Sequence, residues 1–400
     1  MQRAYIFDGI RTAFGRHGGA LAHTRPDDLL AMCLSGLIAR QPVAPEAIED
    51  VVIGCTNQAG EDARNVARHS ALLAGLPVTV AAQTQNRLCG SGLSACIEAA
   101  RAIECGHGDW MIAGGVESMS RAPFVMAKNS QPFGRDVNVY DSTIGARFPN
   151  PAVEAEFGSH TMPQTADNIA SDFHISREDA DAFALTSQQK YQTAKAAGFF
   201  DGEILPVDVA TAKRRITATI SEDEHPRADT QAAKLASLSP LFNGGVVTAG
   251  NASGINDGAA ALLLGSLEAG KALGLRPRAR IVSAAVAGVE PRVMGLGPVE
   301  AIKKALKRAE LTLADMDVIE INEAFAVQVL GCLNQLGIAF DDPRVNPCGG
   351  AIAVGHPLGA SGIRLALTAL RQLEQRQLRY AVVSLCIGVG QGVAMIIERE

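Results

Sequence analysis

Apolar and polar positions along the chain group into short blocks that predict strands and helices in turn. Apolar runs at 4–10, 48–56 and 110–115 have the length of buried strands. Amphipathic runs at 25–41 and 65–75 have the period of helices. This alternation predicts an α/β fold whose sheet is buried on both faces.

The pattern is interrupted between residues 121 and 245. This stretch is rich in proline and glycine, and its clearest periodic segment is a helix at 176–198, where Ser176 and Asp179 fit a capping box. Loops of such length in compact proteins are usually functional.

The alternation then resumes, and the second half repeats the first. The glycine-led helix at 89–103 corresponds to 359–373, and the strands at 49–55 and 109–115 correspond to 316–322 and 379–385. An internal duplication offset by about 270 residues is a strong fold signal. We expect three parts: an N-terminal half at 1–120 completed by 246–270, a loop domain at 121–245, and a C-terminal half at 271–400.

Composition narrows the class of protein. Of 400 residues, 47% are hydrophobic and 20% charged, which is typical of a globular protein with more than one core. The formal net charge of −6 argues against nucleic-acid binding, so the basic runs at 213–215 and 303–308 predict solvated surface, or at most a patch for an anionic ligand. No apolar run approaches the length of a membrane span, and we expect a cytoplasmic protein.

The eight cysteines are scattered and form no CxxC pair or zinc-like cluster. We therefore expect neither a disulfide framework nor a metal site, and most of these thiols are expected to be buried as small apolar groups. A functional thiol has to be identified by its surroundings.

Cys89 has the surroundings of a nucleophile. It lies between a polar strand end and a helix that opens through Gly90, Ser91 and Gly92. Backbone N–H groups and the helix dipole there predict a thiol pKa below the ordinary value of about 8.5. A lone cysteine is more often structural, but these glycines leave room for a substrate. Cys96, two turns later, is expected to pack in the core.

The repeat places His356, in the segment GHPLGASG, on the same rim of the sheet as Cys89. A histidine in a glycine-rich loop is more often a structural hydrogen-bonding group. Here Pro357 stiffens the loop and the glycines clear space, which favours a site histidine.

Cys386 and Asn322 each follow a predicted strand, at the edge where α/β sheets bind ligands. The alternative for Cys386 is a tight turn through GVGQG, and a dinucleotide-binding role for that segment lacks a βαβ unit. The alternative for Asn322 is a helix N-cap.

Six segments in order, NRLCGSG, GGVESMSRAPF, AGNASGINDGAAA, NEAFAVQ, GGAIAVGHPLGASG and CIGVGQG, resemble the landmarks of the thiolase family over essentially the whole chain. Within that family, GEDARNVARHSALLAGLP and DSTIGARFPNP are most similar to members that cleave 3-oxoadipyl-CoA. The resemblance implies two βαβαβαββ halves in a five-layered αβαβα arrangement, a loop domain over the coenzyme A site, and a homodimer or homotetramer.

The resemblance also implies roles. Cys89 would be the acylated nucleophile, His356 the base that deprotonates it, and Cys386 the acid/base at the substrate's α-carbon. Asn322 would hold a water that forms one oxyanion hole with His356, and the N–H groups of Cys89 and Gly388 would form the other. No cofactor is implied, because coenzyme A is itself a substrate, which reacts with 3-oxoadipyl-CoA to give succinyl-CoA and acetyl-CoA.

For coenzyme A, the resemblance implies contacts from Ser253, Arg227, Met162, Phe242 and Phe325. The alternatives are a turn serine at Ser253 and core packing for the two phenylalanines.

Two departures from the family pattern bear on the site. Val389 stands where biosynthetic members have glycine, which leaves Gly388 in place, and HTMPQ favours Met162 over His160 as a coenzyme contact.

Three arginines of the loop domain, Arg121, Arg135 and Arg147, could pair with a substrate carboxylate, although each alone is more often a surface residue.

Three other functions remain open. One is a general acetyl-CoA acetyltransferase. Another is a non-catalytic acyl-CoA or lipid binder of the same fold, which the retained cysteines and histidine disfavour. Decarboxylative condensation expects one cysteine with two histidines, and Cys386 argues against it.

Overall fold

The computed structural model describes residues 2–210 and 216–400, so the basic run at 213–215 lies outside the described residues. One mixed sheet of 11 strands runs through the molecule, with the main order β13-β14-β15-β12-β1-β11-β5-β3-β4. Its two sections join where β1 pairs with β12, at Tyr5 opposite Arg280 and Ile6 opposite Ala279. None of the described helices is long and apolar enough to cross a membrane.

The N-terminal section contains parallel pairs of β3 with β4 and β5, and antiparallel pairs of β11 with β5 and β1. Its elements are β1 (Ala4–Thr12), β2 (Gly15–Arg16), α1 (Pro26–Ala39), β3 (Ile48–Gly54), α2 (Val66–Leu73), β4 (Ala81–Gln85), α3 (Ser91–Glu104), β5 (Trp110–Ser118), β11 (Asn256–Ser266) and α8 (Leu267–Ala272).

The C-terminal section has the matching arrangement, with β13 parallel to β14, and β15 antiparallel to β14 and β12. Its elements are β12 (Ala279–Gly288), α9 (Gly297–Ala309), β13 (Val318–Ile321), α10 (Ala326–Leu336), α11 (Ala351–Val354), α12 (Leu358–Gln375), β14 (Tyr380–Ile387) and β15 (Gln391–Arg399). Short 3-10 turns cover Pro45–Ala47, Met119–Arg121, Phe199–Gly202, Pro291–Leu296 and Leu313–Asp315.

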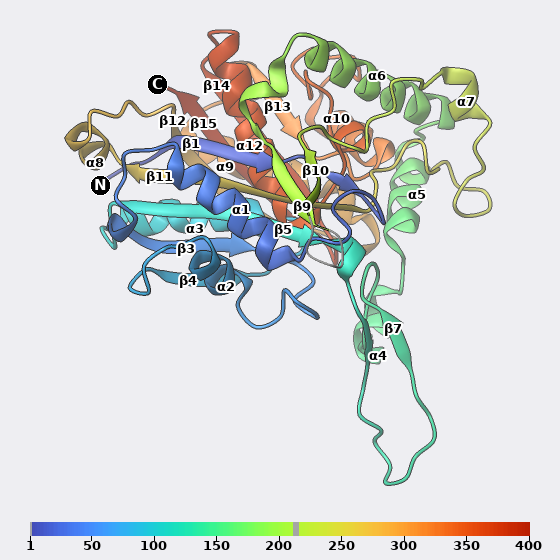
Figure 1. Ribbon diagram of the computed structural model, residues 1–400. Coiled ribbons are helices and arrows are strands. Elements are labelled where there is room, and N and C mark those ends of the chain that lie inside the picture. The colour runs from blue at the N-terminus through green and yellow to red at the C-terminus, as the bar shows by residue number, and fades with distance from the viewer. Residues whose placement is uncertain (1, 211–215) are drawn as a thin grey trace.

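These elements form five layers, αβαβα. Helices α1 and α2 cover one section of the sheet, and α9 covers the other. Between the sections, α3 and α12 pack against each other; α12 contacts β5 and β11 on one side and β14 on the other (Figure 1). The fold predicted from the alternating pattern is thus confirmed, and its solved neighbours are given with the site below.

The central helices begin against each other at glycines. A Cβ at Gly92 would lie 2.3 Å from the carbonyl oxygen of Gly359, and a Cβ at Gly362 would lie 2.3 Å from the backbone nitrogen of Leu93. Real Cβ atoms do not approach this closely, so glycine is required for the contact. It brings together the two loops that carry Cys89 and His356.

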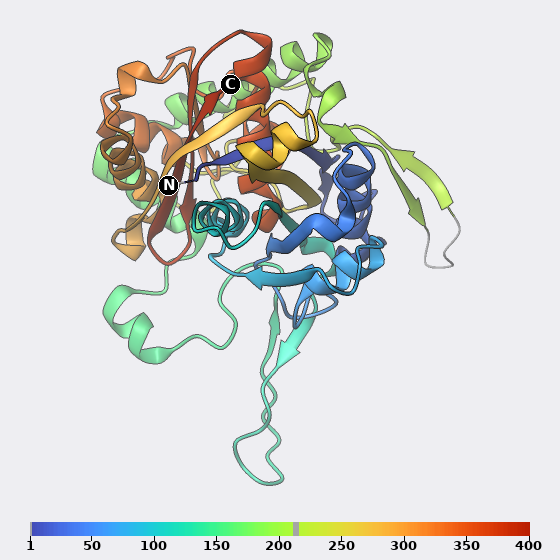
Figure 2. The same cartoon turned by 90° about the vertical axis from the view of Figure 1, so that its left-hand side faces the viewer.

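The inserted residues include helices that pack on the C-terminal section and a projecting hairpin. The hairpin formed by β6 and β7 extends away from the body of the molecule in both views (Figures 1 and 2). The elements are β6 (Phe124–Met126), β7 (Val139–Asp141), α4 (Pro151–Phe157), α5 (Met162–Phe173), α6 (Arg177–Ala196), β8 (Ile204–Leu205), β9 (Val207–Ala210), β10 (Ile216–Ile220) and α7 (Ala232–Ala236).

The capping box predicted at the start of α6 is present. The Ser176 hydroxyl accepts the N–H of Asp179 at 3.0 Å, and the Asp179 carboxylate accepts the N–H of Ser176 at 3.2 Å. The helix after β13 begins at Ala326 and not directly after Asn322, because its N-cap is Phe325 in extended conformation.

Candidate active site

Cys89 lies in the turn between β4 and α3, just before the N-cap residue Gly90. Leu88 has a φ of 46°, in the left-handed region that leucine rarely adopts. Gly90 packs against β14, since a Cβ there would lie 2.6 Å from Cδ1 of Ile387. The turn therefore places Cys89 against the end of β14, where Cys386 lies.

Burial raises the pKa of the Cys89 thiol to about 11, although the N–H groups of Gly388 and of Cys89 itself lower it in part. The prediction of a lowered pKa is therefore wrong. The helix start supplies donors as expected, but removing water from the thiolate costs more than they return. A thiol in this state needs a base to become a nucleophile.

His356 has a hydrogen-bond network that fixes its tautomer. Its Nδ1 lies 2.6 Å from the hydroxyl oxygen of Ser361, and that hydroxyl donates to the carbonyl of Pro357 at 3.2 Å. The Ser361 oxygen can then accept only from Nδ1–H, which leaves the lone pair on Nε2. Burial and the nearby Arg364 lower the pKa of His356 to about 3, so the ring is neutral. A neutral imidazole whose Nε2 carries no proton can act as a hydrogen-bond acceptor and as a base.

Asn322 lies beside that nitrogen, with its Nδ2 3.3 Å from Nε2 of His356. It is fully buried after β13, and its N–H donates to the carbonyl of Ser384 at 2.9 Å. Since α10 begins at Ala326, the N-cap alternative for Asn322 is wrong. Its buried Oδ1 has no hydrogen-bond partner among the described residues. The residue can therefore accept one further hydrogen bond.

Asn256 positions the histidine loop, and the sequence reasoning missed it. Its Oδ1 accepts the N–H of His356 at 2.9 Å, and its Nδ2 donates to the carbonyl of Gly15 at 3.0 Å. Its side chain occupies the space above Gly355, where φ is 105°. Asn256 belongs to the motif AGNASGINDGAAA, but the sequence pattern gave a role only to Ser253 of that motif.

Cys386 is 1% exposed near the end of β14. Burial and the neighbouring Cys89 raise its pKa well above the ordinary value, so the thiol holds its proton. Gly388, two residues further on, faces Met162, since a Cβ there would lie 3.6 Å from the Met162 sulfur. Val389 has a φ of 64° and is 62% exposed, so this departure from glycine leaves the N–H of Gly388 beside Cys89.

The residues predicted to contact coenzyme A fall into two groups. Ser253 donates its N–H to the carbonyl of Ala324 at 2.9 Å, next to the Asn322 loop, and Phe325 packs in one apolar cluster with Cys386. Met162 is 37% exposed and lies beside Gly388, and His160 is also exposed.

The second group lies further out. Arg227 is exposed and lines an open pocket of about 590 Å³ together with Arg16, His17 and His225. Phe242 is 37% exposed. Met162 thus lies beside Gly388, Phe325 shares an apolar cluster with Cys386, and Ser253 is bonded next to the Asn322 loop. Arg227 instead lines the open pocket.

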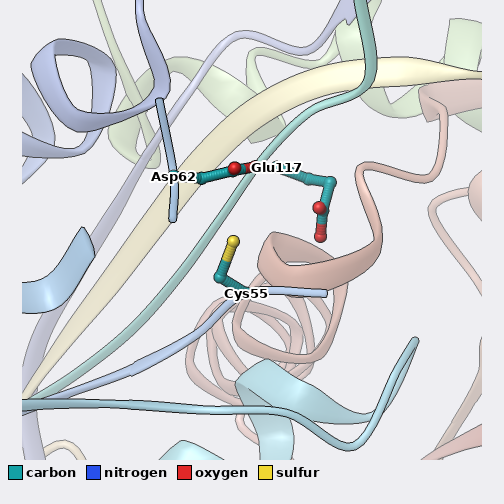
Figure 3. A group of neighbouring side chains, drawn as sticks. All are labelled: Cys55, Asp62 and Glu117. Carbon is teal, nitrogen blue, oxygen red and sulfur yellow. The ribbon is translucent and has the colours of Figure 1, made fainter. Parts of the chain in front are cut away.

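A buried cluster joins the start of α12, close in sequence to His356, to the loop after β3 (Figure 3). Glu117, at the end of β5, lies beside Cys55 and Asp62. Its carboxylate accepts the N–H groups of Thr56 at 3.0 Å, Asn57 at 2.9 Å and Gly359 at 2.9 Å. Both carboxylate oxygens are thus engaged by the backbone, and the cluster fixes the start of α12 to the loop after β3.

Comparison with known proteins identifies the family of the chain. The model of the thiolase N-terminal domain matches residues 4–268, and that of the thiolase C-terminal domain matches residues 275–399. The chain belongs to the thiolase family and is an acyltransferase.

Two similar full-length relatives have been named for their substrate. A 3-oxoadipyl-CoA/3-oxo-5,6-dehydrosuberyl-CoA thiolase of Escherichia coli K12 is 57% identical over 401 residues, and a beta-ketoadipyl-CoA thiolase of Acinetobacter baylyi is 58% identical; both alignments cover 100% of each chain. The solved structure of Bacillus anthracis acetyl-CoA acetyltransferase superimposes with a TM-score of 0.93 at 38% identity, covering 100% of this chain and 99% of that one.

Proposed function

We propose that this enzyme cleaves 3-oxoadipyl-CoA with coenzyme A and yields succinyl-CoA and acetyl-CoA. The observation that carries the proposal is the pair of neighbouring protonated thiols, Cys89 and Cys386, together with the unprotonated Nε2 of His356 just before the adjacent central helix. The choice of substrate is supported by the full-length relatives at 57% and 58% identity.

In the first half-reaction, Nε2 of His356 takes the proton of the Cys89 thiol, and the sulfur forms a bond to the 3-keto carbon. The bond between C2 and C3 then breaks, and its electron pair leaves on C2 as the acetyl-CoA enolate. Cys386 donates its proton to that carbon. Transfer of the His356 proton to the Cys386 thiolate resets both groups.

In the second half-reaction, His356 takes the proton of an incoming coenzyme A thiol, which attacks the acyl group on Cys89. As the carbon–sulfur bond to Cys89 breaks, the proton returns to that sulfur. Every proton is accounted for within these three residues, so the cycle needs no cofactor.

Negative charge develops on the 3-keto oxygen when the thiol attacks, and on the thioester oxygen of the acetyl-CoA enolate when it leaves. Each of these oxyanions needs hydrogen-bond donors. The N–H groups of Cys89 and Gly388 lie at the nucleophilic sulfur and would stabilise one oxyanion. Asn322, with its unpartnered Oδ1, would hold a water that serves the other together with His356.

Coenzyme A would lie along Ser253, Met162 and Phe325, and its anionic nucleotide end near Arg227, with Phe242 as an exposed apolar contact.

A homodimer or homotetramer is supported by the exposed apolar side chains of the β6–β7 hairpin, since such patches mark protein interfaces. They include Phe124 at 75% and Phe133 at 102% exposure. All eight cysteines are free, which supports a cytoplasmic location.

The test compares initial rates of coenzyme A-dependent cleavage for 3-oxoadipyl-CoA and acetoacetyl-CoA. The proposal expects a higher kcat/KM for 3-oxoadipyl-CoA. Equal or better turnover of acetoacetyl-CoA would instead identify a general acetyl-CoA acetyltransferase.

A further inference from the structure

Arg147 is a half-buried cation without a carboxylate partner among the described residues. Its Nη2 donates to Oδ1 of Asn57 at 2.7 Å and to the carbonyl of Ser142 at 2.7 Å. Its Nε is buried and has no hydrogen-bond partner in the described chain. An arginine held in place by neutral acceptors, with a buried donor unused, is suited to receive an anion.

The other two candidate arginines of the loop domain differ from Arg147. Arg121 is already neutralised by Glu61, with Nε–Oε2 and Nη2–Oε1 distances of 2.5 Å and 2.7 Å. Arg135 is exposed on the segment between β6 and β7. A substrate carboxylate would have to displace Glu61 from Arg121 or bind Arg135 in open water, where an ion pair contributes little.

Arg147 is also connected to the nucleophile through a short series of contacts. Its partner Asn57 follows Thr56, whose hydroxyl donates to the carbonyl of Leu88 at 3.0 Å, and Leu88 directly precedes Cys89. The carboxylate of Glu117 binds the N–H groups of both Thr56 and Asn57, which holds this loop rigid. The guanidinium therefore has a fixed position relative to the Cys89 turn.

We propose that Arg147 binds the terminal carboxylate of the substrate's acyl chain and so determines specificity for a dicarboxylic 3-oxoacyl-CoA, an inference that rests on the proposed function. In 3-oxoadipyl-CoA this carboxylate carbon is three bonds from the carbon that the thiol attacks, so it has to lie close to the Cys89 turn. The Nη1 donor has no hydrogen-bond partner among the described residues and is available for it, while Nη2 keeps its bonds to Asn57 and Ser142.

The experiment measures kcat/KM of Arg147→Ala, Arg147→Lys and Arg121→Ala on two substrates of equal chain length. These are 3-oxoadipyl-CoA and 3-oxohexanoyl-CoA, in which a methyl group replaces the carboxylate. Arg147→Ala should lower kcat/KM for 3-oxoadipyl-CoA by about ten- to a hundredfold, and that for 3-oxohexanoyl-CoA by less than about twofold. Arg147→Lys should retain part of the preference for 3-oxoadipyl-CoA, because lysine keeps the positive charge but cannot donate two parallel hydrogen bonds to a carboxylate. Arg121→Ala should leave the ratio of the two substrates unchanged.

An equal loss on both substrates in Arg147→Ala would make this residue structural and overturn the proposal. Arg87, two residues before Cys89, is the rival: a selective loss in Arg87→Ala with the preference intact in Arg147→Ala would also overturn it. Acetylation of Cys89 by acetyl-CoA checks the fold of each variant without using the carboxylate. Failure of the wild type to cleave either substrate would refute the proposed function itself. Cleavage of both substrates without preference would instead overturn only the specificity assigned to Arg147.

Discussion

The Nδ1 atom of His356 lies 2.6 Å from the hydroxyl oxygen of Ser361, and this contact determines which ring nitrogen is free to act as a base. The repeat gives the other central helix a serine at the matching position. Ser91 accepts the N–H of Arg87 at 2.8 Å and donates to the carbonyl of Leu88 at 2.6 Å. The duplicated serine thus holds the cysteine loop in one half and the histidine ring in the other.

Ser361→Ala should slow thiolysis, because the imidazole loses the acceptor that fixes its tautomer. A hydrogen bond of this kind contributes on the order of 1 kcal/mol, so kcat/KM should fall by about five- to tenfold. The matched control is Ser94→Ala, since the Ser94 hydroxyl is buried without a partner in the described chain. Steady-state kinetics in which the two variants behave alike would contradict this role for Ser361.

The pH dependence of Cys89 alkylation should follow a high thiol pKa. Because the pKa is raised to about 11, the thiolate fraction in the free enzyme should rise about tenfold per unit between pH 7 and 9. The rate of iodoacetamide labelling, read from the Cys89 peptide by mass spectrometry, should rise in the same way, with exposed Cys105 as an internal reference. A rate that is high and flat below pH 8 would mean a preformed thiolate–imidazolium pair instead.

Cys386→Ser should separate the two half-reactions. Serine is a far weaker acid than cysteine, so cleavage of 3-oxoadipyl-CoA should fall by about a hundredfold or more. Exchange of acetyl groups between acetyl-CoA and labelled coenzyme A requires only Cys89 and His356, and should remain within about threefold of wild type. A parallel loss of cleavage and exchange would refute this division of roles.

Gly362→Ala should destabilise the protein, because the new Cβ would lie 2.3 Å from the backbone nitrogen of Leu93. Overpacking of this kind costs about 1–3 kcal/mol in the free energy of unfolding. Gly331→Ala is the helical control, because its Cβ would meet only side-chain carbons, of Ile169 and Leu296, and no backbone atom. Thermal unfolding at one protein concentration should give a lower Tm for Gly362→Ala than for Gly331→Ala. A higher Tm for Gly362→Ala than for Gly331→Ala would show that α3 and α12 can move apart at this contact.

The sequence was most informative where a periodic pattern or the repeat applied. The strand and helix alternation predicted an α/β fold with a sheet buried on both faces, whereas the five layers were implied by the family resemblance. The match between 89–103 and 359–373 predicted that Cys89 and His356 precede the two central helices. Cys96 is buried in the core, as expected from its position two turns into α3.

Other features depend on contacts between distant segments and could not be read from local pattern. The pKa of Cys89 depends on its burial by segments distant in sequence, which the helix-start argument did not include. Asn256 reaches His356 across 100 residues, and Glu117 reaches Gly359 across 242. The three loop-domain arginines look alike in sequence, and only the Glu61 partner of Arg121 distinguishes it from Arg147.

The most direct test of the account is to identify the residue that carries the acyl group. The enzyme is incubated with acetyl-CoA, quenched in acid, digested and analysed by peptide mass spectrometry, with His356→Ala as the comparison. We predict one acetyl group on Cys89 in the wild type, and much slower acetylation in His356→Ala because the base is missing. Acetylation confined to Cys96 or Cys348, or none on any cysteine, would contradict the assignment of Cys89 as the nucleophile.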